Sequence, residues 1–269
     1  MSQYLFDAVL KMRFRSFTQG AAQDNLSQEK LLSIRFPVPE LRVQKKIADI
    51  LSTYDGLIEN NRRRIALLEE AARLLYREWF VRFRFPGHEH VDINDGVPEG
   101  WERRNLGSVL TLQRGFDLPI DCRVSGGIPV YGSAGIVGMH NQSKVDYQTV
   151  ITGRSGSLGN ICYADRPCWP LNTSLWVKEF KGVSPILAYF ILANMNLAQF
   201  NGGASVPTLD RNVVHAVPII VPPPFFASLF DDYIRPIFAQ KTALDLQNQK
   251  LTQARDLLLP RLMNGEIAV

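Results

Sequence analysis

Residues 41–80, "LRVQKKIADILSTYDGLIENNRRRIALLEEAARLLYREWF", carry the strongest structural signal in this chain. It contains no proline and one glycine, and its apolar residues return every three or four positions. That spacing places them on one side of an α-helix as a heptad seam, which predicts one long helix that needs a partner. The seam consists of Ile47, Leu51, Tyr54, Ile58, Asn61, Ile65, Leu68, Ala72, Leu75 and Trp79.

A second, weaker seam lies 183 residues further along the chain and supplies the partner helix, over about 225–263. It consists of Phe230, Ile234, Ile237, Lys241, Leu244, Asn248, Leu251, Arg255, Leu258 and Leu262. Because a globular segment connects the two helices and must return the chain, we expect them to be antiparallel. Buried asparagines prefer each other to apolar neighbours, so Asn61 should face Asn248 and fix the register. This register sets Ile65 opposite Leu244, Ile47 opposite Leu262 and Trp79 opposite Phe230.

The offset of 183 also holds upstream of the helices, which indicates an internal repeat. Residues 17–40 resemble residues 200–223, and "YLFDAVL" (4–10) lies over "LAYFILA" (187–193). The repeat therefore covers roughly 1–80 and 184–263. Chance similarity between two amphipathic helices is the alternative, and the matched Gly-Ala and proline positions ahead of the helices argue against it. Residues 1–40 resemble the closing part of a domain whose beginning is absent.

Residues 96–223 differ in character from the helical segments. Short β-rich runs such as "IPVYG", "YQTVITG" and "NICYA" alternate with glycine-rich turns, which predicts a compact, mainly β domain with one helix near 184–196. We divide the chain into a remnant tail (1–40), a first spacer helix (41–85), an acidic linker (86–95), the mainly β domain (96–223) and a second spacer helix (224–269). The predicted fold class is α+β, with a mainly β domain and two long antiparallel helices.

The composition restricts the function classes. With 269 residues, 46% apolar content and no run of 18 apolar residues, we expect a cytoplasmic protein that neither spans nor binds a membrane. The three cysteines lack a CxxC spacing, so we interpret them as core thiols rather than disulfide or zinc ligands. His88 and His90 are more typical of a solvated linker than of a metal site. Residues 41–85 carry ten Lys or Arg against six Asp or Glu, which fits either a polyanionic partner or a solvated helix face.

Several ordered blocks resemble a known family. They are "GVPEGWERRNLGSVL" (96–110), "GIPVYGSAGIVG" (127–138), "VITGRSGSLGNICYADRPCWPLNTSLWV" (150–177) and "LDRNVVHAVPIIVPPP" (209–224). With the two helices, they are similar to the DNA specificity subunits of type I restriction–modification systems, over essentially the whole chain. The 96–223 segment then resembles a target recognition domain.

The resemblance implies a non-catalytic protein that binds double-stranded DNA. Members of this family usually carry two recognition domains separated by two antiparallel helices, and they recognise two half-sites across a fixed gap. The helices dock DNA adenine methyltransferase subunits, and restriction subunits that translocate DNA complete the complex. The chain itself would hold no cofactor, because S-adenosylmethionine, ATP and Mg belong to the partner subunits. A helix of about 40 residues is roughly 60 Å long, about the length of 17 base pairs, and would serve as a spacer.

This chain departs from the family pattern because it contains one complete recognition domain. It resembles a half-length subunit, and two copies would restore two recognition domains and make the target a gapped palindrome. The alternative is an inactive or silent fragment that acts only as a coiled-coil dimerisation module.

Base edges are contacted mostly by Arg, Lys, Asn and Gln, with Ser, Thr and Tyr assisting. Such residues lie beside glycines, where the backbone can approach a groove closely. The candidates are Gln113, Arg114, Tyr131, Ser133, His140, Asn141, Ser143, Lys144, Arg154 and Ser155, with Asn172, Thr173, Ser205 and Thr208 as weaker ones. A solvated polar loop at 140–144 and a tight turn at 153–159 are the alternatives. The turn lacks the Gly-Lys-Ser/Thr ending of a phosphate-binding loop.

Arg62, Arg63 and Arg64 form a basic triplet halfway along the first helix. They would hold phosphates of the unread gap, or else pair with Glu59, Glu69 or a docked methyltransferase. Trp101, Trp169 and Trp176 are expected to be packing residues. A stand-alone nuclease would need clustered carboxylates around a metal, and the nearest approaches, Asp117 with Asp121 and Asp231 with Asp232, lack an accompanying Glu-x-Lys or histidine.

Overall fold

The computed structural model describes residues 38–203 and 205–268. The described residues up to Glu69, together with those from Ala239 onward, form one compact unit. Glu70–Phe238 form the second. The expected remnant tail and the first half of the repeat ahead of the helix lie almost wholly outside the described residues. The mixed α+β fold class with two long helices is confirmed.

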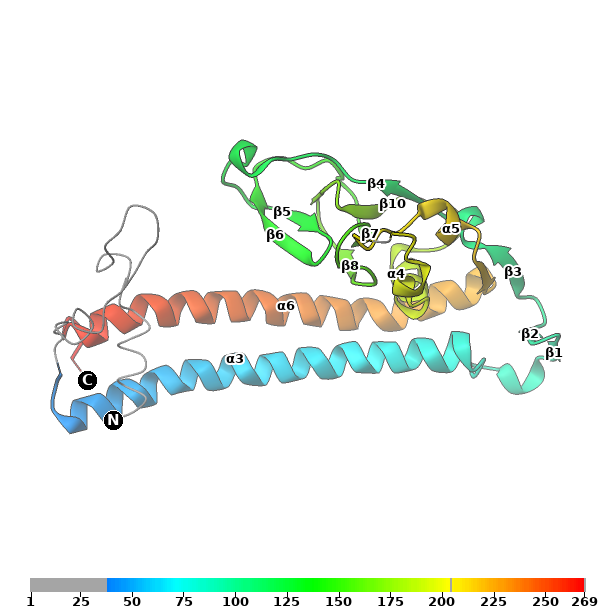
Figure 1. Ribbon diagram of the computed structural model, residues 1–269. Coiled ribbons are helices and arrows are strands. Elements are labelled where there is room, and N and C mark those ends of the chain that lie inside the picture. Colours follow the sequence, from blue (N-terminus) through cyan, green and yellow to red (C-terminus); the bar gives the residue numbers. More distant parts are fainter. Residues whose placement is uncertain (1–37, 204, 269) are drawn as a thin grey trace. The chain divides into compact units, whose positions relative to one another are not determined.

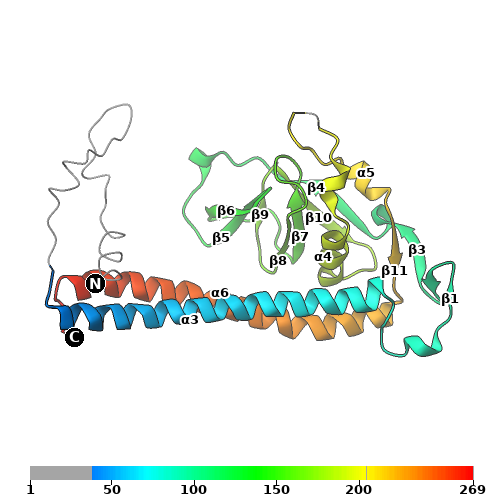
Figure 2. The same ribbon diagram turned by 60° about the horizontal axis from the view of Figure 1, so that its bottom comes forward.

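Two long helices carry the seams expected from the sequence. Helix α3 spans Leu41–Tyr76 and helix α6 spans Pro224–Met263. Within each unit, the parts of α3 and α6 lie side by side and run in opposite directions (Figure 1, Figure 2). Helix α6 ends at the Asn264–Gly265 stop, where Gly265 takes a positive φ of 72° and the Glu266 N–H donates to the Arg261 carbonyl at 2.9 Å.

The first unit is a helix pair whose register agrees with the sequence expectation. Asn61 is buried, and its Nδ2 donates to Asn248 Oδ1 at 3.0 Å and to Gln247 Oε1 at 3.2 Å. Ile47 and Leu262 belong to one buried apolar cluster, as this register requires. The asparagine side chains therefore satisfy each other inside the seam instead of remaining unpaired in an apolar interface.

The charged members of the second seam have acidic partners on helix α3. Lys241 Nζ lies 2.6 Å from Glu69 Oε1, and Arg255 Nη1 lies 2.5 Å from Asp55 Oδ1. Hydrogen bonding to Asp55 raises the pKa of Arg255 further. Both pairs are partly exposed, so each contributes modestly to stability, and their positions support the same register as the asparagines.

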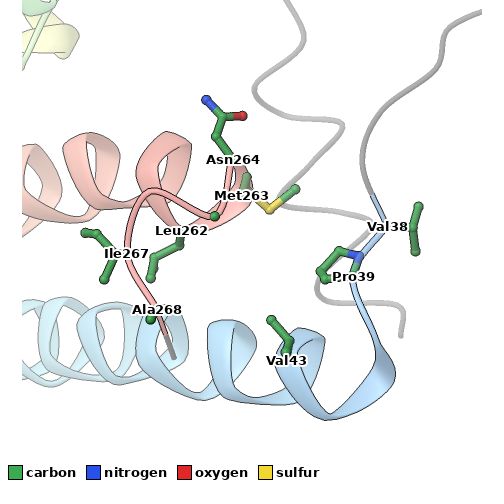
Figure 3. Close-up of a pocket in the computed structure, with 9 residues that line it drawn as sticks. Val38, Pro39, Val43, Leu262, Met263, Asn264, Ile267 and Ala268 are labelled. Atoms are coloured by element: carbon green, nitrogen blue, oxygen red, sulfur yellow. The ribbon is translucent and has the colours of Figure 1, made fainter.

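Apolar side chains line a hollow of about 460 Å³ where α3 begins and α6 ends (Figure 3). Val38, Pro39 and Val43 line one side, and Leu262 and Met263 line the other. Val43 and Met263 also pack against the apolar cluster of this unit. The hollow is therefore the open end of the apolar seam between the two helices.

In the second unit, α3 ends at Tyr76, before the end of the expected spacer helix at residue 85. A π-helical turn follows at Arg77–Val81, in which the Arg82 N–H donates to the Arg77 carbonyl at 2.9 Å. The wider turn allows the consecutive residues Trp79 and Phe80 both to be buried. Their ring centroids lie 5.9 Å and 4.9 Å from that of Phe230, so the expected pairing of Trp79 with Phe230 is confirmed.

Short strands and helices make up the rest of the second unit. Its strands are β1 (Ile93–Asn94), β2 (Val97–Pro98), β3 (Glu102–Asn105), β4 (Leu110–Arg114), β5 (Ile128–Gly132), β6 (Gly135–His140), β7 (Thr149–Gly153), β8 (Ile161–Ala164), β9 (Trp169–Pro170), β10 (Ser174–Phe180) and β11 (Pro218–Val221). Single 3-10 turns occur at His88–His90, Leu106–Ser108, Ile120–Cys122 and Leu197–Phe200. The expected helix near 184–196 is α4 (Pro185–Asn194), and the structure adds the short helix α5 (Arg211–His215).

The strands form small sheets that carry the loops of interest. A four-stranded antiparallel sheet has the order β4-β10-β7-β8, and a three-stranded sheet has the order β6-β5-β9, in which β5 and β9 are parallel. Two-stranded pairs join β11 with β3 and β1 with β2. Strands β7 and β10 are buried along much of their length, whereas β4 ends at the exposed Arg114. The ends of the central strands therefore lead into surface loops.

Aromatic side chains dominate the core of the second unit. Phe230 is fully buried and has its ring within about 6 Å of those of Tyr76, Trp79, Phe80 and Phe190. The expectation that Trp101, Trp169 and Trp176 are packing residues is confirmed, because all three are buried. The cysteines differ: Cys168 is buried and Cys162 is half-buried, but Cys122 is exposed, so the expectation of a core thiol is wrong at Cys122.

Candidate nucleic-acid interface

The loop after strand β4 lies directly against the loop between β9 and β10. The Gly115 N–H donates to the Ser174 carbonyl at 3.1 Å, and the Asn172 N–H donates to the Phe116 carbonyl at 3.0 Å. A Cβ atom on Gly115 would lie 2.2 Å from the Leu171 carbonyl oxygen, so glycine is required for this approach. Backbone contacts thus hold the 114–117 and 171–173 loops together.

The loop after strand β7 joins the same group. The Arg154 and Ser155 N–H groups both donate to the Thr173 carbonyl, at 2.8 Å and 3.1 Å. Ser155 also forms an isolated β-bridge with Thr208. Ser133, at the β5–β6 turn, lies close by, because a Cβ atom on Gly153 would be 2.9 Å from the Ser133 carbonyl oxygen.

We name this surface the polar loop face. Its members come from loops that are far apart in the sequence and are held together by the contacts above and below. They are Arg114, Asp117, Ser133, Lys144, Arg154, Ser155, Asn172, Thr173 and Thr208.

Arg154 is half-buried and has a fixed direction. Its Nη1 donates to the Asn172 carbonyl at 3.3 Å, and its own carbonyl accepts from the Leu209 N–H at 2.8 Å. The guanidinium has further donors beyond the one used here. Arg154 is therefore anchored at one nitrogen, and its planar head can donate to a base edge or a phosphate.

Lys144 is exposed, and aromatic rings hold its ammonium group. Nζ lies 5.0 Å from the Trp169 ring centroid and 5.9 Å from that of Phe116, and the Lys144 N–H donates to the Cys168 carbonyl at 3.0 Å. Cation–π contacts of this kind contribute about 0.5–1 kcal/mol at exposed sites. They reduce the conformational freedom of a long side chain, so its charge is presented beside the 114–117 loop.

Two of the predicted base-contacting residues are buried in the structure. Tyr131 belongs to the apolar cluster around Trp176, and burial raises its pKa. His140 is also buried, and its Nδ1 accepts from the Val124 N–H at 3.1 Å while its ring packs edge-on against Trp169. The structure contradicts the expectation that these side chains are available to a groove. Tyr131 and His140 instead pack inside the fold and stabilise the loops.

The other predicted residues have mixed surroundings. Gln113 is half-buried and pairs in register with Trp176 on strand β10. Asn141 is exposed, and the Ser143 hydroxyl donates to the Asp146 carboxylate. Of the weaker candidates, Asn172, Thr173 and Thr208 join the polar loop face, whereas Ser205 is exposed next to residue 204, whose position is not described.

Sequence reasoning missed two polar side chains near these loops. Asp117 follows Phe116 in the 114–117 loop and accepts a hydrogen bond from Asn172 Nδ2. Arg166, in the β8–β9 loop, is exposed and close enough to Tyr131 to oppose the rise in its pKa. The position of Asp117 two residues after Gly115 was a signal available in the sequence, whereas nothing in the sequence connects Arg166 with Tyr131.

The arginine triplet lies on the helix surface as expected. Arg62, Arg63 and Arg64 are all exposed, and Arg63 Nε pairs with Glu59 Oε1 at 3.1 Å. An exposed i,i+4 pair of this kind contributes only a few tenths of a kcal/mol, so it does not prevent Arg63 from meeting another anion.

Within residues 38–203 and 205–268, no group of three or more His, Cys, Asp or Glu side chains is arranged to hold a metal ion. In the same ranges, no helix combines the length and the apolar character needed to cross a membrane.

Comparisons with known proteins agree with the architecture. The family model described as "Type I restriction modification DNA specificity domain" matches residues 2–70 and again residues 98–226. The chain is 24% identical to the type I restriction enzyme MjaIX specificity subunit of Methanocaldococcus jannaschii, over 100% of this chain and 67% of that protein. It is 21% identical to the HindI specificity subunit of Haemophilus influenzae, over 97% of this chain and 74% of that protein.

A solved structure supports the fold. The S subunit of a type I restriction–modification system from M. genitalium superposes with a TM-score of 0.65 at 19% identity, covering 97% of this chain and 72% of that one. The two matches to the family model together span more than half of the chain. The chain therefore belongs to the family of type I restriction–modification DNA specificity subunits.

Proposed function

We propose that this chain recognises double-stranded DNA through the polar loop face and acts as a non-catalytic specificity subunit. The observation that carries the proposal is that Arg114, Lys144 and Arg154 lie on loops that contact one another and also carry amide and hydroxyl residues. Such groups are the ones that contact base edges and phosphates. The cations supply attraction to any DNA, and the polar groups beside them supply the sequence preference.

The long helices supply the second part of the proposal. Helices of 36 and 40 residues, with a register fixed by Asn61 and Asn248, support a role as a spacer between recognition elements. Exposed apolar side chains on these helices, including Leu67 and Leu257, are available to partner subunits. We propose that DNA adenine methyltransferase subunits and restriction subunits dock on the chain, and that they bind S-adenosylmethionine, ATP and Mg.

The oligomeric state forms the third part of the proposal. The described residues contain one recognition unit, formed by residues between Glu70 and Phe238. Two copies related by a two-fold axis would present two identical recognition units and would select a gapped palindrome. A homodimer is thus the assembly that we propose for the active form.

The test is to express this chain with a matching methyltransferase subunit and to map adenine methylation across a genome. The proposal expects one gapped motif with two identical half-sites in inverted orientation. Arg154→Ala should abolish or change the motif, whereas Arg103→Ala, an exposed arginine on strand β3 of the same unit, should preserve it. An unmethylated genome, with no sequence-specific DNA binding by the complex, would instead support a silent fragment that only dimerises.

The arginine triplet gives an independent test on the spacer. If Arg63 holds a phosphate of the unread gap, Arg63→Ala should reduce the slope of log K against log salt concentration by about one. Binding should weaken equally for all sequences. Arg73→Ala, an exposed arginine on the same helix, serves as the control. An unchanged slope for Arg63→Ala would exclude the phosphate contact.

A further inference from the structure

Asp117 is the acidic residue of the polar loop face. Its side chain is exposed, and one carboxylate oxygen, Oδ1, accepts from Asn172 Nδ2. Asp117 forms no ion pair with the residues that the structure describes, although Arg114, Lys144 and Arg154 come from the same group of loops. A carboxylate in this position needs a physical explanation, because the phosphates of DNA repel it.

The chemistry of a carboxylate limits what it can recognise. An ionised carboxylate only accepts hydrogen bonds, so it cannot bind phosphate oxygens or the acceptor atoms of guanine and thymine. In the major groove, the donors are the N4 amino group of cytosine and the N6 amino group of adenine. Adenine places its N7 acceptor beside that amino group, which opposes a carboxylate, whereas cytosine has no acceptor there. Cytosine is therefore the base that suits Asp117.

Asn172 fixes the direction of this carboxylate. Its side chain donates to Asp117, its backbone N–H donates to the Phe116 carbonyl at 3.0 Å, and its carbonyl accepts from Arg154 Nη1 at 3.3 Å. One residue thus orients an acceptor and a cation together. Because Oδ1 is held, Oδ2 is presented in a defined position, as a base-selecting group requires.

We infer that Asp117 is a specificity-determining residue that accepts a hydrogen bond from the N4 amino group of one cytosine in each half-site. Asn172 is its positioning residue. The inference rests on the proposed function, since it names one base that the polar loop face selects. The inference also explains why a carboxylate lies on this surface. Asp117 weakens binding to most DNA sequences, because its charge is repelled by phosphates and its carboxylate loses hydrogen bonds to water. Binding is restored only where a cytosine amino group donates the hydrogen bond that water had supplied.

The experiment selects binding sites from a random duplex library with the whole chain in complex with its methyltransferase partner. The wild type should select a motif that contains a fixed cytosine. Asp117→Asn should lose the preference for cytosine at that position by about tenfold and shift it towards adenine, because an asparagine pairs with adenine N6 and N7. The other positions of the motif should stay the same. Asp121→Asn, which alters an exposed carboxylate four residues along the same loop, is the matched control and should select the wild-type motif.

Duplexes with a modified cytosine distinguish a direct contact between Asp117 and the base from an indirect effect of a rearranged loop. N4-methylcytosine at the selected position replaces the amino hydrogen that faces the major groove, whereas 5-methylcytosine leaves the amino group intact. The N4-methyl group should weaken wild-type binding by about tenfold, the effect of one base contact, and should not weaken Asp117→Asn. Asn172→Ala should reduce the same cytosine preference while circular dichroism shows a folded protein.

The outcomes distinguish this inference from the proposed function. A wild-type complex that selects no motif would overturn both. The role of Asp117 would be overturned if Asp117→Asn selected the wild-type motif unchanged. It would also be overturned if the N4-methyl group weakened the binding of neither protein. Both outcomes would leave the proposed function standing.

Discussion

Replacing Asn61 by alanine should lower the free energy of unfolding of the helix pair by about 1–3 kcal/mol. The side chain is 4% exposed, and its Nδ2 donates to Asn248 Oδ1 at 3.0 Å and to Gln247 Oε1 at 3.2 Å. Each such hydrogen bond contributes about 0.5–1.5 kcal/mol net. Asn248 is only half-buried, so water can reach the partner that Asn61→Ala leaves behind, and the loss should stay within this range.

A double-mutant cycle with Asn248→Ala measures the contact itself. The coupling between Asn61 and Asn248 should be about 1 kcal/mol, the value of one direct hydrogen bond. The assay is urea unfolding of the whole chain, with hydrogen exchange of the amides near Asn61 to assign the loss to the helix pair. The double replacement by leucine should be at least as stable as the wild type, because it buries two apolar side chains in the seam.

The same cycle can refute the reasoning about register. If the costs of Asn61→Ala and Asn248→Ala add to within about 0.3 kcal/mol, the two side chains do not interact in solution. The leucine pair removes one determinant of the register and leaves the Lys241–Glu69 and Arg255–Asp55 ion pairs in place. Methylated half-sites should therefore appear at more than one separation only when these ion pairs are removed as well.

Three further outcomes follow from the second unit. Phe230→Ala, which removes a fully buried ring packed against other aromatic rings, should destabilise the unit by about 3–5 kcal/mol in thermal or urea unfolding. His215 Nε2 accepts from the Leu112 N–H at 2.9 Å, and burial lowers the pKa of His215 below 6.5. The unfolded chain therefore protonates His215 more readily than the folded chain does. The contribution of His215 to stability should be constant above about pH 6.5 and should fall as the pH drops towards the pKa of His215 in the folded protein. Urea unfolding midpoints of His215→Gln should lack this decrease. Gly115→Ala would place a methyl group against the Leu171 carbonyl, so it should cost about 1–3 kcal/mol and weaken DNA binding, and wild-type binding by a stable variant would contradict the close loop approach.

The sequence predicted the helices and their register well, because heptad periodicity is a local property that repeats over many turns. The β-rich runs around 128–132 and 161–164 were equally local signals, and both form strands. The end of the first helix was less predictable. Whether residues 77–81 form an α-helix or a π-helical turn depends on how Trp79 and Phe80 fit against Phe230, a contact between residues about 150 positions apart.

The candidate site was predictable only in its residue types. Arg114 and Arg154 stood beside glycines in the sequence, Lys144 lay in a polar loop, and all three are exposed or half-buried in the structure. Tyr131 and His140 were candidates of the same kind but are buried, because Tyr131 packs in the cluster around Trp176 and His140 packs against Trp169. A polar residue next to a glycine has the same appearance in a sequence whether its side chain points outward or inward.

The sequence was sufficient to predict the two long helices, the asparagine pair that sets their register and the family of the chain. These depend on spacing and on ordered motifs along one dimension. The folded structure was needed to see which polar side chains share a surface, since Asp117, Arg154 and Asn172 meet through contacts between separate loops. Pairing between distant strands sets those contacts, and it follows from the burial of the whole sheet rather than from any short stretch of residues.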